Sequence, residues 1–158
     1  MKLDEVDLRI FEILQTDGRI TNFDLAKRIG LTPAPTLARV KKLELSGYIR
    51  RYVALVDQAK LGMSVTAFVS VILESHKKKT TFDFVKAVEA MPEVLECHHI
   101  AGDEDFLLKV VASSPAEYET FVLEKLTKVE GIEKVKTTFV LSSSKLETAI
   151  PVRGGLSS

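Results

Sequence analysis

The stretch LTPAPTLARVKKLELSGYI, residues 31–49, has the features of a helix that begins with two prolines. Thr32 can cap such a helix from the position before its first turn. Pro33 then falls at the first helical position, where the missing N–H has no partner inside the helix and the fixed φ is already helical. Pro35 is tolerated for the same reason, because first-turn amides are not bonded within the helix. We therefore predict a helix over residues 32–46.

One face of this predicted helix is apolar, and the opposite face combines small residues with cations. At roughly 100° per residue, the buried stripe comprises Leu37, Val40 and Leu43. The opposite face comprises Ala34, Pro35, Ala38, Lys41 and Lys42, with Arg39 at its edge. Small residues let a backbone approach base edges, and long cations contact phosphates or guanine. The pattern favours a reader of the DNA major groove and leaves open a three-helix bundle with a solvated basic face.

Two shorter helical patterns precede this segment. Residues 4–16 place apolar side chains at helical spacing, with acids in the first turn where the helix dipole favours them. The next pattern begins after Thr21, which can form a capping box with Asp24, and it ends at Gly30. Three helices with a short, glycine-containing turn describe a helix-turn-helix unit. Residues 48–57 alternate like a strand, which predicts a winged form of this unit.

The charge is distributed unevenly along a chain whose formal net charge is zero. Residues 1–62 hold 11 basic and 8 acidic residues, whereas residues 63–158 hold 11 basic and 14 acidic residues. Within residues 19–51, eight bases accompany two acids. A small basic domain joined to a mildly acidic domain is expected where only the first domain contacts a polyanion.

Length and composition indicate a globular protein of one large or two small domains, with 158 residues of which 46% are hydrophobic. A single cysteine, Cys97, excludes an intramolecular disulfide and fits a reducing cytoplasm. No secretory signal follows Met1, and no apolar run approaches the roughly 18 residues of a membrane span. We therefore expect a soluble, cytoplasmic protein without a membrane partner.

The second half of the chain alternates between strand and helix patterns in the order βαββαβ. The predicted strands cover residues 64–74, 94–101, 106–112 and 132–142, and the predicted helices cover residues 80–91 and the segment that begins at Ser114-Pro115. This order describes a ferredoxin-like α+β domain, with two helices on one face of an antiparallel sheet. The other face of the sheet needs cover, which self-association would supply most simply.

Four segments also match a known family: LDEVDLRIFEILQTDGRIT at 3–21, DLAKRIGLTPAPTLARVKKLE at 24–44, GYI at 47–49 and ECHHIAGDEDFLLKV at 96–110. With these segments the chain resembles the Lrp/AsnC family of prokaryotic transcription regulators over nearly its whole length. The resemblance implies a sequence-specific DNA-binding regulator that is not an enzyme. A small molecule, usually an amino acid, would modulate its assembly or its affinity for DNA.

The family's recognition helix corresponds to residues 32–46 of this sequence. The resemblance therefore implies that the residues in contact with double-stranded DNA are Thr32, Ala34, Pro35, Thr36, Arg39, Lys41 and Lys42. Ala34 and Ala38 stand where relatives often carry Ser, Thr or a long polar side chain. This departure predicts that the helix reads groove shape and backbone more than base edges.

The resemblance also implies an effector site near the turn between the second and third strands of the second domain. Its residues would be Gly102, Asp103 and Asp105, with His99, Thr138, Val140 and Ser142 on adjoining strands or a neighbouring subunit. The acids can accept from an ammonium group, and backbone N–H groups around Gly102 can donate to a carboxylate. We expect an amino-acid effector, no cofactor, and a homodimer that assembles further to an octamer.

The predicted organisation has four parts along the chain. They are a helix-turn-helix domain at 1–50, a linker strand and turn at 51–63, a ferredoxin-like domain for effector binding and oligomerisation at 64–148, and a flexible tail at 149–158.

The residues alone leave several alternatives open. The GDED segment can be an ordinary surface turn, and His99 can be either a determinant of ligand choice or a strand histidine with a satisfied partner. Cys97 and His99 point to one face of a strand and could share a metal, although no second ligand pair has zinc-like spacing. No nucleophile–base pair and no phosphate-binding glycine loop indicates an enzyme. A module that binds an amino acid or a protein partner without DNA is a further alternative, against which the cations beside the two prolines argue.

Overall fold

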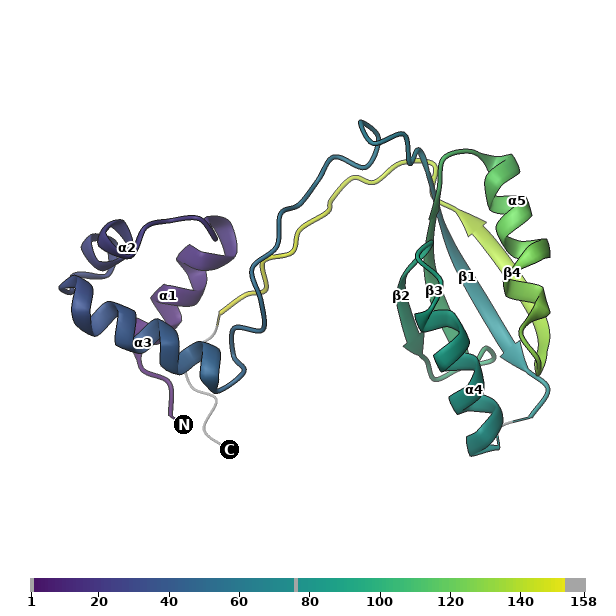
Figure 1. Ribbon diagram of the computed structural model, residues 1–158, viewed down its shortest axis with the longest axis horizontal. Coiled ribbons are helices and arrows are strands. Elements are labelled where there is room, and N and C mark those ends of the chain that lie inside the picture. The colour runs from purple at the N-terminus through teal and green to yellow at the C-terminus, as the bar shows by residue number, and fades with distance from the viewer. Residues whose placement is uncertain (1, 76, 153–158) are drawn as a thin grey trace. The chain divides into compact units, whose positions relative to one another are not determined.

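The computed structural model describes residues 2–75 and 77–152, and these divide into two compact units. The first unit combines residues 2–55 with residues 145–152, and the second comprises residues 56–144. The three helices of the first unit and the helix-covered sheet of the second are shown in Figure 1. The last described residues therefore belong with the N-terminal helices, although the sequence predicts that the second domain continues to residue 148.

Helix α1 covers Glu5–Thr16 and begins with a capping box. The Asp7 backbone N–H donates to Asp4 Oδ1 at 2.9 Å, and the Asp4 backbone N–H donates to Asp7 Oδ2 at 3.2 Å. These carboxylates satisfy amides that have no partner inside the helix. The acids that the sequence assigns to the helix dipole thus also make specific hydrogen bonds.

Helix α2 covers Asn22–Ile29 and begins and ends where the sequence predicts. Thr21 is its N-cap, and the Thr21 Oγ1 accepts from the backbone N–H of Asp24 at 3.1 Å. Gly30 follows the last helical residue with φ at 74°, a conformation that glycine adopts without steric cost. The helix and its two ends are confirmed, whereas the predicted capping box differs in its second half, since the Asp24 Oδ2 accepts from the Thr21 hydroxyl at 2.6 Å.

Helix α3 covers Pro33–Leu45, with Pro33 at the first helical position as predicted. Thr32 is the N-cap residue, but its side chain makes no capping hydrogen bond. The predicted buried stripe is wrong at Leu37, whose side chain is 44% exposed, because Thr36 occupies the interior instead. Thr36 can be buried since its hydroxyl donates to the Thr32 carbonyl at 2.9 Å, so the polar group is satisfied within the helix.

The core of the first unit is small. It comprises Ile10, Leu25, Ile29 and Leu43, one or two from each helix. Half-buried apolar side chains such as Val40 and Ile49 pack around these four. A core of this size leaves the relative positions of the three helices dependent on polar contacts as well.

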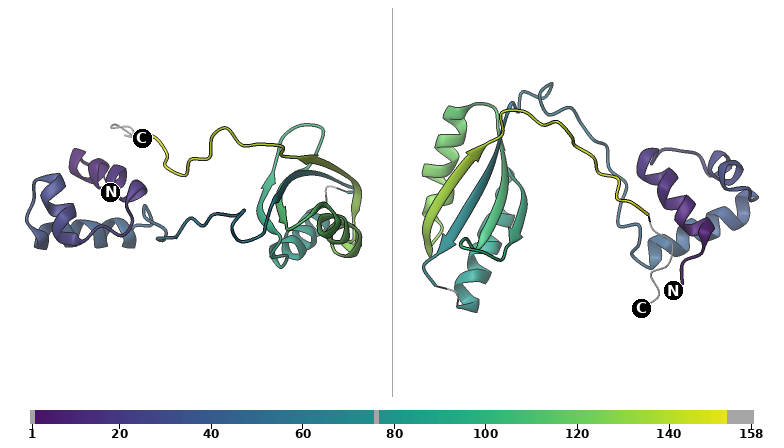
Figure 2. Two further views of the ribbon diagram at one scale, coloured as in Figure 1. Left: turned by 90° about the horizontal axis from the view of Figure 1, so that it is seen from above. Right: turned by 180° about the vertical axis from the view of Figure 1, so that it is seen from behind.

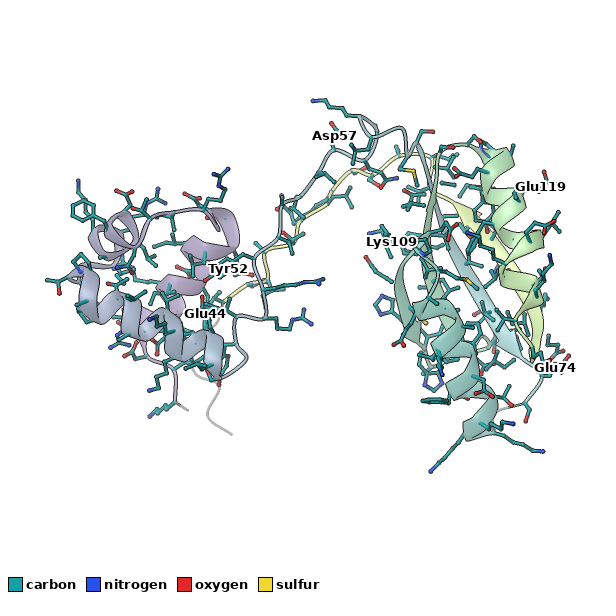
Figure 3. All side chains as sticks on the ribbon, in the orientation of Figure 1. Glu44, Tyr52, Asp57, Glu74, Lys109 and Glu119 are labelled. Atoms are coloured by element: carbon teal, nitrogen blue, oxygen red, sulfur yellow. The ribbon has the colours of Figure 1, made fainter. Side chains whose placement is uncertain are left out.

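Residues 50–56 are not a strand, so the predicted strand over 48–57 is wrong. A strand needs a neighbour for its hydrogen-bond ladder, and the described strands of this chain pair only with one another. Tyr52 nevertheless anchors this segment, since its hydroxyl donates to Glu44 Oε1 at 3.0 Å (Figure 3). The pKa of Tyr52 is raised to about 12, mainly by partial burial and secondarily by the hydrogen bond to Glu44.

The second unit has the predicted βαββαβ order. Its elements are β1 (Val65–Leu73), α4 (Lys78–Glu89), β2 (Val94–His99), β3 (Phe106–Ala112), α5 (Pro115–Glu124), the short 3-10 helix η1 (Leu126–Lys128) and β4 (Ile132–Phe139). The strands form one antiparallel sheet in the order β2-β3-β1-β4. The ferredoxin-like fold is confirmed, and β4 ends three residues earlier than the sequence predicts.

Helices α4 and α5 cover one face of this sheet, as the view from above in Figure 2 shows. Alternate residues of the central strands point into the core between them, beginning with Ala67 and Val69 on β1. Phe84 of α4 is fully buried, and its ring lies 4.7 Å from that of Phe106, centroid to centroid. Tyr118 of α5 joins β4 through its hydroxyl, which lies 2.5 Å from the Thr137 Oγ1.

Among the described residues of the second unit, no helix lies over the opposite face of the sheet (Figure 2). Strand alternation assigns to this face Phe68, Ser70 and Ile72 of β1, Leu107 and Lys109 of β3, Glu96 and His98 of β2, and Lys134, Lys136 and Thr138 of β4. Apolar side chains therefore concentrate on the two central strands, and charged ones lie mostly on the edges. Glu96 accepts from Lys109 Nζ at 2.9 Å, and this contact, more than His98, lowers the pKa of Glu96.

The described end of the chain contacts helix α1. The Gln15 side-chain amide makes two hydrogen bonds with the backbone of Ile150, donating to its carbonyl at 3.1 Å and accepting from its N–H at 2.8 Å. Ile150 lies in the segment that the sequence predicts as a flexible tail, so this position is held against the first unit.

Candidate DNA-binding and effector sites

The outward face of α3 presents small residues near its start and cations further along. Ala34, Pro35 and Ala38 are exposed, and so are Lys41 and Lys42. No ion-pair partner of either lysine lies among the described residues. This side of the helix therefore offers close backbone approach and two unneutralised positive charges, as the sequence predicts.

Two of the residues predicted to contact DNA lie on the inward side of α3. Thr36 has no exposed surface, and its hydroxyl is bonded to the Thr32 carbonyl. Its side chain is thus removed from the surface that could meet a duplex. Arg39, almost one turn further along, is half-buried at the edge of this side.

Arg39 is bound to both acids of the α1 capping box. Its Nη1 donates to Asp4 Oδ2 at 2.7 Å and to Asp7 Oδ1 at 2.9 Å. These contacts raise the pKa of Arg39, with the Asp4 hydrogen bond as the largest cause. The pKa of Asp4 is lowered, first by the Asp7 backbone N–H and then by Arg39. We call Asp4, Asp7 and Arg39 the clasp.

A second polar contact joins α2 to α3, and the sequence reasoning missed it. The side-chain amide of Asn22 donates to the carbonyl of Pro33 at 2.8 Å. The contact links the first turns of the two helices across the turn of the helix-turn-helix unit. Helical periodicity does not reveal it, because Asn22 belongs to neither apolar stripe.

Three further cations of the helical unit, Arg19, Lys27 and Arg28, lie around the turn between α1 and α2. Here a depression of about 660 Å³ is lined by Asp17, Arg19, Ile20, Thr21, Asp24, Lys27 and Arg28. Both signs of charge line it, and it coincides with neither predicted site.

The predicted effector turn is tied to the end of β1. Gly102 has φ at 150°, which a residue with a side chain rarely adopts. The Asp105 Oδ2 accepts from the backbone N–H of Leu73 at 2.8 Å, and the Asp105 N–H donates to the Val71 carbonyl at 2.9 Å. Asp105 therefore continues the hydrogen bonding between β3 and β1 past the last paired residues. Asp103 is exposed, and no cation lies within ion-pair distance of it among the described residues.

His99 and Cys97 point to the helix side of β2. The His99 ring stacks on Phe106, with 4.9 Å between centroids and 23° between planes, while the His99 side chain stays exposed. Cys97 is half-buried, and burial is the main cause that raises the pKa of its thiol. Among residues 2–75 and 77–152, no group of three His, Cys, Asp or Glu side chains could hold a metal ion.

The other predicted effector residues lie at the far end of the sheet from this turn. Thr138 pairs with Phe68, and Val140 donates its N–H to the carbonyl of Thr66 at 2.9 Å. Phe68 precedes Leu73 by five residues, or about 17 Å along β1. Ser142 is exposed beyond the end of β4. One chain therefore does not bring Thr138, Val140 and Ser142 together with the turn at 102–105.

Two family models match the chain in the same order as its two units. A winged helix-turn-helix DNA-binding model matches residues 3–50, and the Lrp/AsnC ligand-binding domain matches residues 66–150. The transcriptional regulator AzlB of Bacillus subtilis is 36% identical over 150 residues, which cover 95% of this chain and 96% of the relative. The chain belongs to the Lrp/AsnC family.

Other Lrp/AsnC regulators match over similar lengths. The Bkd operon transcriptional regulator of Pseudomonas aeruginosa is 37% identical, with 96% of this chain and 99% of the relative covered. The leucine-responsive regulatory protein of Rhizobium meliloti is 39% identical, with 92% of this chain and 93% of the relative covered.

Solved Lrp/AsnC structures agree with the fold. A transcriptional regulator of Neisseria meningitidis, solved as a complex with L-Met, has a TM-score of 0.91 and 35% identity. The match covers 95% of this chain and 97% of the Neisseria chain. AsnC of Escherichia coli has a TM-score of 0.86 and 26% identity, with 94% and 98% covered.

Membership of the Lrp/AsnC family defines the general function. The chain is a transcription regulator with an N-terminal helix-turn-helix domain that binds DNA and a C-terminal domain that binds a ligand. Within the described residues, no helix has the length and apolar character that crossing a membrane requires.

Proposed function

We propose that this regulator binds double-stranded DNA through the outward face of α3 and responds to an amino acid bound by its second domain. The observation that carries the DNA-binding part is the exposed combination of Ala34, Pro35 and Ala38 with Lys41 and Lys42. Support for the amino-acid part comes from the L-Met complex of the Neisseria relative and the matched ligand-binding domain. The proposed role is regulatory and not enzymatic, and it is exercised in the cytoplasm, where a prokaryotic chromosome lies.

The proposed DNA contacts are Thr32, Ala34, Pro35, Lys41 and Lys42. The three residues at the start of α3 would lie against the groove, and the lysines would neutralise phosphates. With alanine at positions 34 and 38, few side-chain donors reach base edges, so we expect much of the specificity to come from DNA shape.

We propose an effector site that two chains complete. Asp103 would accept from the ammonium group, and the backbone N–H groups around Gly102 would donate to the carboxylate. Asp105 would act by holding this turn to β1, since its carboxylate already accepts from Leu73. Because Thr138, Val140 and Ser142 lie at the other end of the sheet, a second copy would bring them to the turn, with His99 at the edge of the site.

The uncovered face of the sheet supports a proposal of self-association. Its apolar centre, with Phe68, Ile72 and Leu107, is flanked by charged edge strands, which is the arrangement of a protein–protein interface. We propose that this face joins two chains into a homodimer and that dimers assemble further to an octamer. Sedimentation equilibrium measures both steps, and a Phe68→Glu variant that stays dimeric would contradict the use of this face.

DNA binding is tested by the salt dependence of affinity for a duplex selected from a random library. Each lost phosphate contact should reduce the slope of log K against log salt by about 0.9. Lys41→Gln with Lys42→Gln should therefore lower the slope by about 1.8. Lys128→Gln is the matched control, because this exposed lysine lies in the second unit and pairs with Glu124. A double variant with an unchanged slope would show that α3 is not the recognition helix.

The effector is tested by thermal shift with each of the twenty amino acids. The cognate one at 100 times its Kd should stabilise the second unit by about 2.7 kcal/mol. Asp103→Asn should abolish this shift without changing the melting temperature of the free protein, because Asp103 is exposed and has no ion-pair partner within residues 2–75 and 77–152. If no amino acid shifts the wild-type midpoint, amino-acid sensing is refuted.

A further inference from the structure

The clasp uses every carboxylate oxygen of its two acids. Asp4 Oδ1 and Asp7 Oδ2 accept the two backbone N–H groups of the α1 capping box. The other two oxygens, Asp4 Oδ2 and Asp7 Oδ1, accept from the same nitrogen of Arg39. The first turn of α1 and the middle of α3 are thus parts of one hydrogen-bonded network. Such charge-assisted bonds are about twice as strong as neutral ones.

The position of the clasp separates Arg39 from the other cations of α3. Its side chain is 35% exposed, and the Asp7 side chain is 10% exposed. Arg39 lies at the edge of the inward side of the helix, beside the positions of Thr36 and Leu43, which are fully buried. A phosphate that bound Arg39 would have to displace two carboxylates that already hold it. The clasp as a whole also carries two negative charges and one positive charge, so it offers no attraction to a duplex.

We infer that Arg39 is a positioning residue that fixes α3 against the start of α1 in the orientation needed to present Ala34, Lys41 and Lys42 to DNA. It does this without contacting the duplex. The inference rests on the proposed role of α3 as the recognition helix. The clasp supplements the small core of this unit by holding α3 to the start of α1, and the Asn22–Pro33 contact holds α2 to α3.

A phosphate-contacting Arg39 and a positioning Arg39 predict opposite changes in DNA affinity when Asp4 and Asp7 are neutralised. Asp4→Asn with Asp7→Asn keeps side-chain oxygens that can cap α1 but removes both negative charges. If Arg39 contacted phosphate, freeing it from these acids would strengthen DNA binding. If Arg39 positions α3, the same double variant should weaken binding to the selected duplex, even though the domain becomes more positive.

The experiment uses the full chain and two duplexes, the selected one and a scrambled duplex of equal length and composition. For Asp4→Asn/Asp7→Asn we expect about tenfold weaker binding to the selected duplex, comparable to one lost specific contact. Binding to the scrambled duplex should not weaken, because non-specific affinity depends on charge. Adding Arg39→Gln to the double variant should cause no further loss at the selected duplex. Arg39→Gln alone should leave the salt slope unchanged, whereas the control Lys42→Gln should reduce it by about 0.9.

Three results would overturn the inference. One is equal or tighter binding of the selected duplex by Asp4→Asn/Asp7→Asn, and another is a salt slope lowered by Arg39→Gln. The third comes from hydrogen exchange, which needs no DNA and applies even if Arg39→Gln does not fold. The double asparagine variant should speed exchange in α3 by about tenfold but not in α5. Unchanged protection of α3 would refute the clasp. A wild-type chain that selects no duplex would contradict the proposed function instead.

Discussion

The two units of this regulator achieve their geometry by different physical means. The sheet unit buries a continuous apolar layer between its strands and α4 and α5, with Phe84, Val69 and Leu108 fully inside. Among its described residues, the helical unit centres its core on four larger apolar side chains, with the small Ala26 also buried. What it lacks in apolar contact is supplied by polar links between elements, namely the clasp, the Asn22–Pro33 contact and the Gln15–Ile150 pair.

This difference indicates how each unit should respond to substitution. Burial is nondirectional and roughly proportional to area, so a large core sets stability more than fine orientation. Hydrogen bonds are directional, so a polar link contributes to the angle between two helices as well as to their stability. Substitutions in the helical unit should therefore impair function before they unfold the unit. Substitutions in the sheet unit should lower stability before they impair function.

The largest expected effect is in the sheet core. Phe84→Ala removes a fully buried ring that contacts Phe106 and should lower the free energy of unfolding of the sheet unit by about 3–5 kcal/mol. Phe82→Ala is the matched control on the same helix, since Phe82 is 65% exposed and should cost no more than about 0.5 kcal/mol. Calorimetry of both variants measures this, and similar costs would contradict the division between core and surface.

A middle-sized effect is expected from two single hydrogen bonds, one in each unit. Asn22→Ala and Tyr118→Phe should each cost about 1 kcal/mol in their own unit. Only Asn22→Ala should also lower the affinity for the selected duplex, because Asn22 links α2 to α3. The Tyr118 hydroxyl makes its hydrogen bond within the sheet unit. If both variants bind DNA like the wild type, polar links do not orient α3.

A smaller effect is expected at the end of the chain. Gln15→Ala removes two exposed hydrogen bonds to Ile150 and should cost about 0.5 kcal/mol or less in the helical unit. Hydrogen exchange should be faster over residues 145–152 in this variant. Thr148→Ala, also exposed and in the same segment, is the control and should leave exchange unchanged.

The smallest effect concerns acid pH. The pKa of Asp4 is lowered in the folded state, so its contribution to stability is present above its ordinary pKa of 3.8 and is lost as pH falls through the lower folded value. Asp4→Asn should therefore flatten the decline of the helical unit's melting temperature below about pH 4. The sheet unit retains its own decline, since Lys109 lowers the pKa of Glu96. If the melting temperature of the helical unit falls with pH as steeply in Asp4→Asn as in the wild type, Asp4 does not contribute to stability in this way.

The order of elements could be predicted because each pattern has a local physical cause. The β-branched alternation of residues 65–73 and the capping residue Thr21 act within a few residues of their own position. Glycine at position 30 ends α2 for the same kind of reason. Helix boundaries and the βαββαβ order therefore follow from short segments of sequence.

The failures have non-local causes. Leu37 and Thr36 exchange the expected interior and exterior positions because a threonine can satisfy its hydroxyl on its own helix, which a hydropathy stripe does not register. The strand predicted over 48–57 has the right alternation but no partner among the strands described. Arg39 is assigned to DNA by its charge and its helix, while its actual partners lie more than thirty residues earlier in sequence.

The effector residues show the same limit at the level of the sheet. Asp105 and Thr138 both lie near strand ends, and the sequence analysis assigns both to one effector site. The antiparallel register of β1 with β4 puts them at opposite ends of the sheet, and register is a property of pairing, not of either segment alone. The chemistry of the turn could thus be predicted from sequence, whereas the number of chains needed to complete the site could not.

The hydrogen bonds between Gln15 and Ile150 join positions 135 residues apart. During synthesis the three helices leave the ribosome long before residue 150 is added, and at 5–20 residues per second the interval is on the order of ten seconds. The nascent helical unit must therefore fold without this contact and acquire it only after the whole sheet unit has been made. The domain that is translated first is the last to be completed.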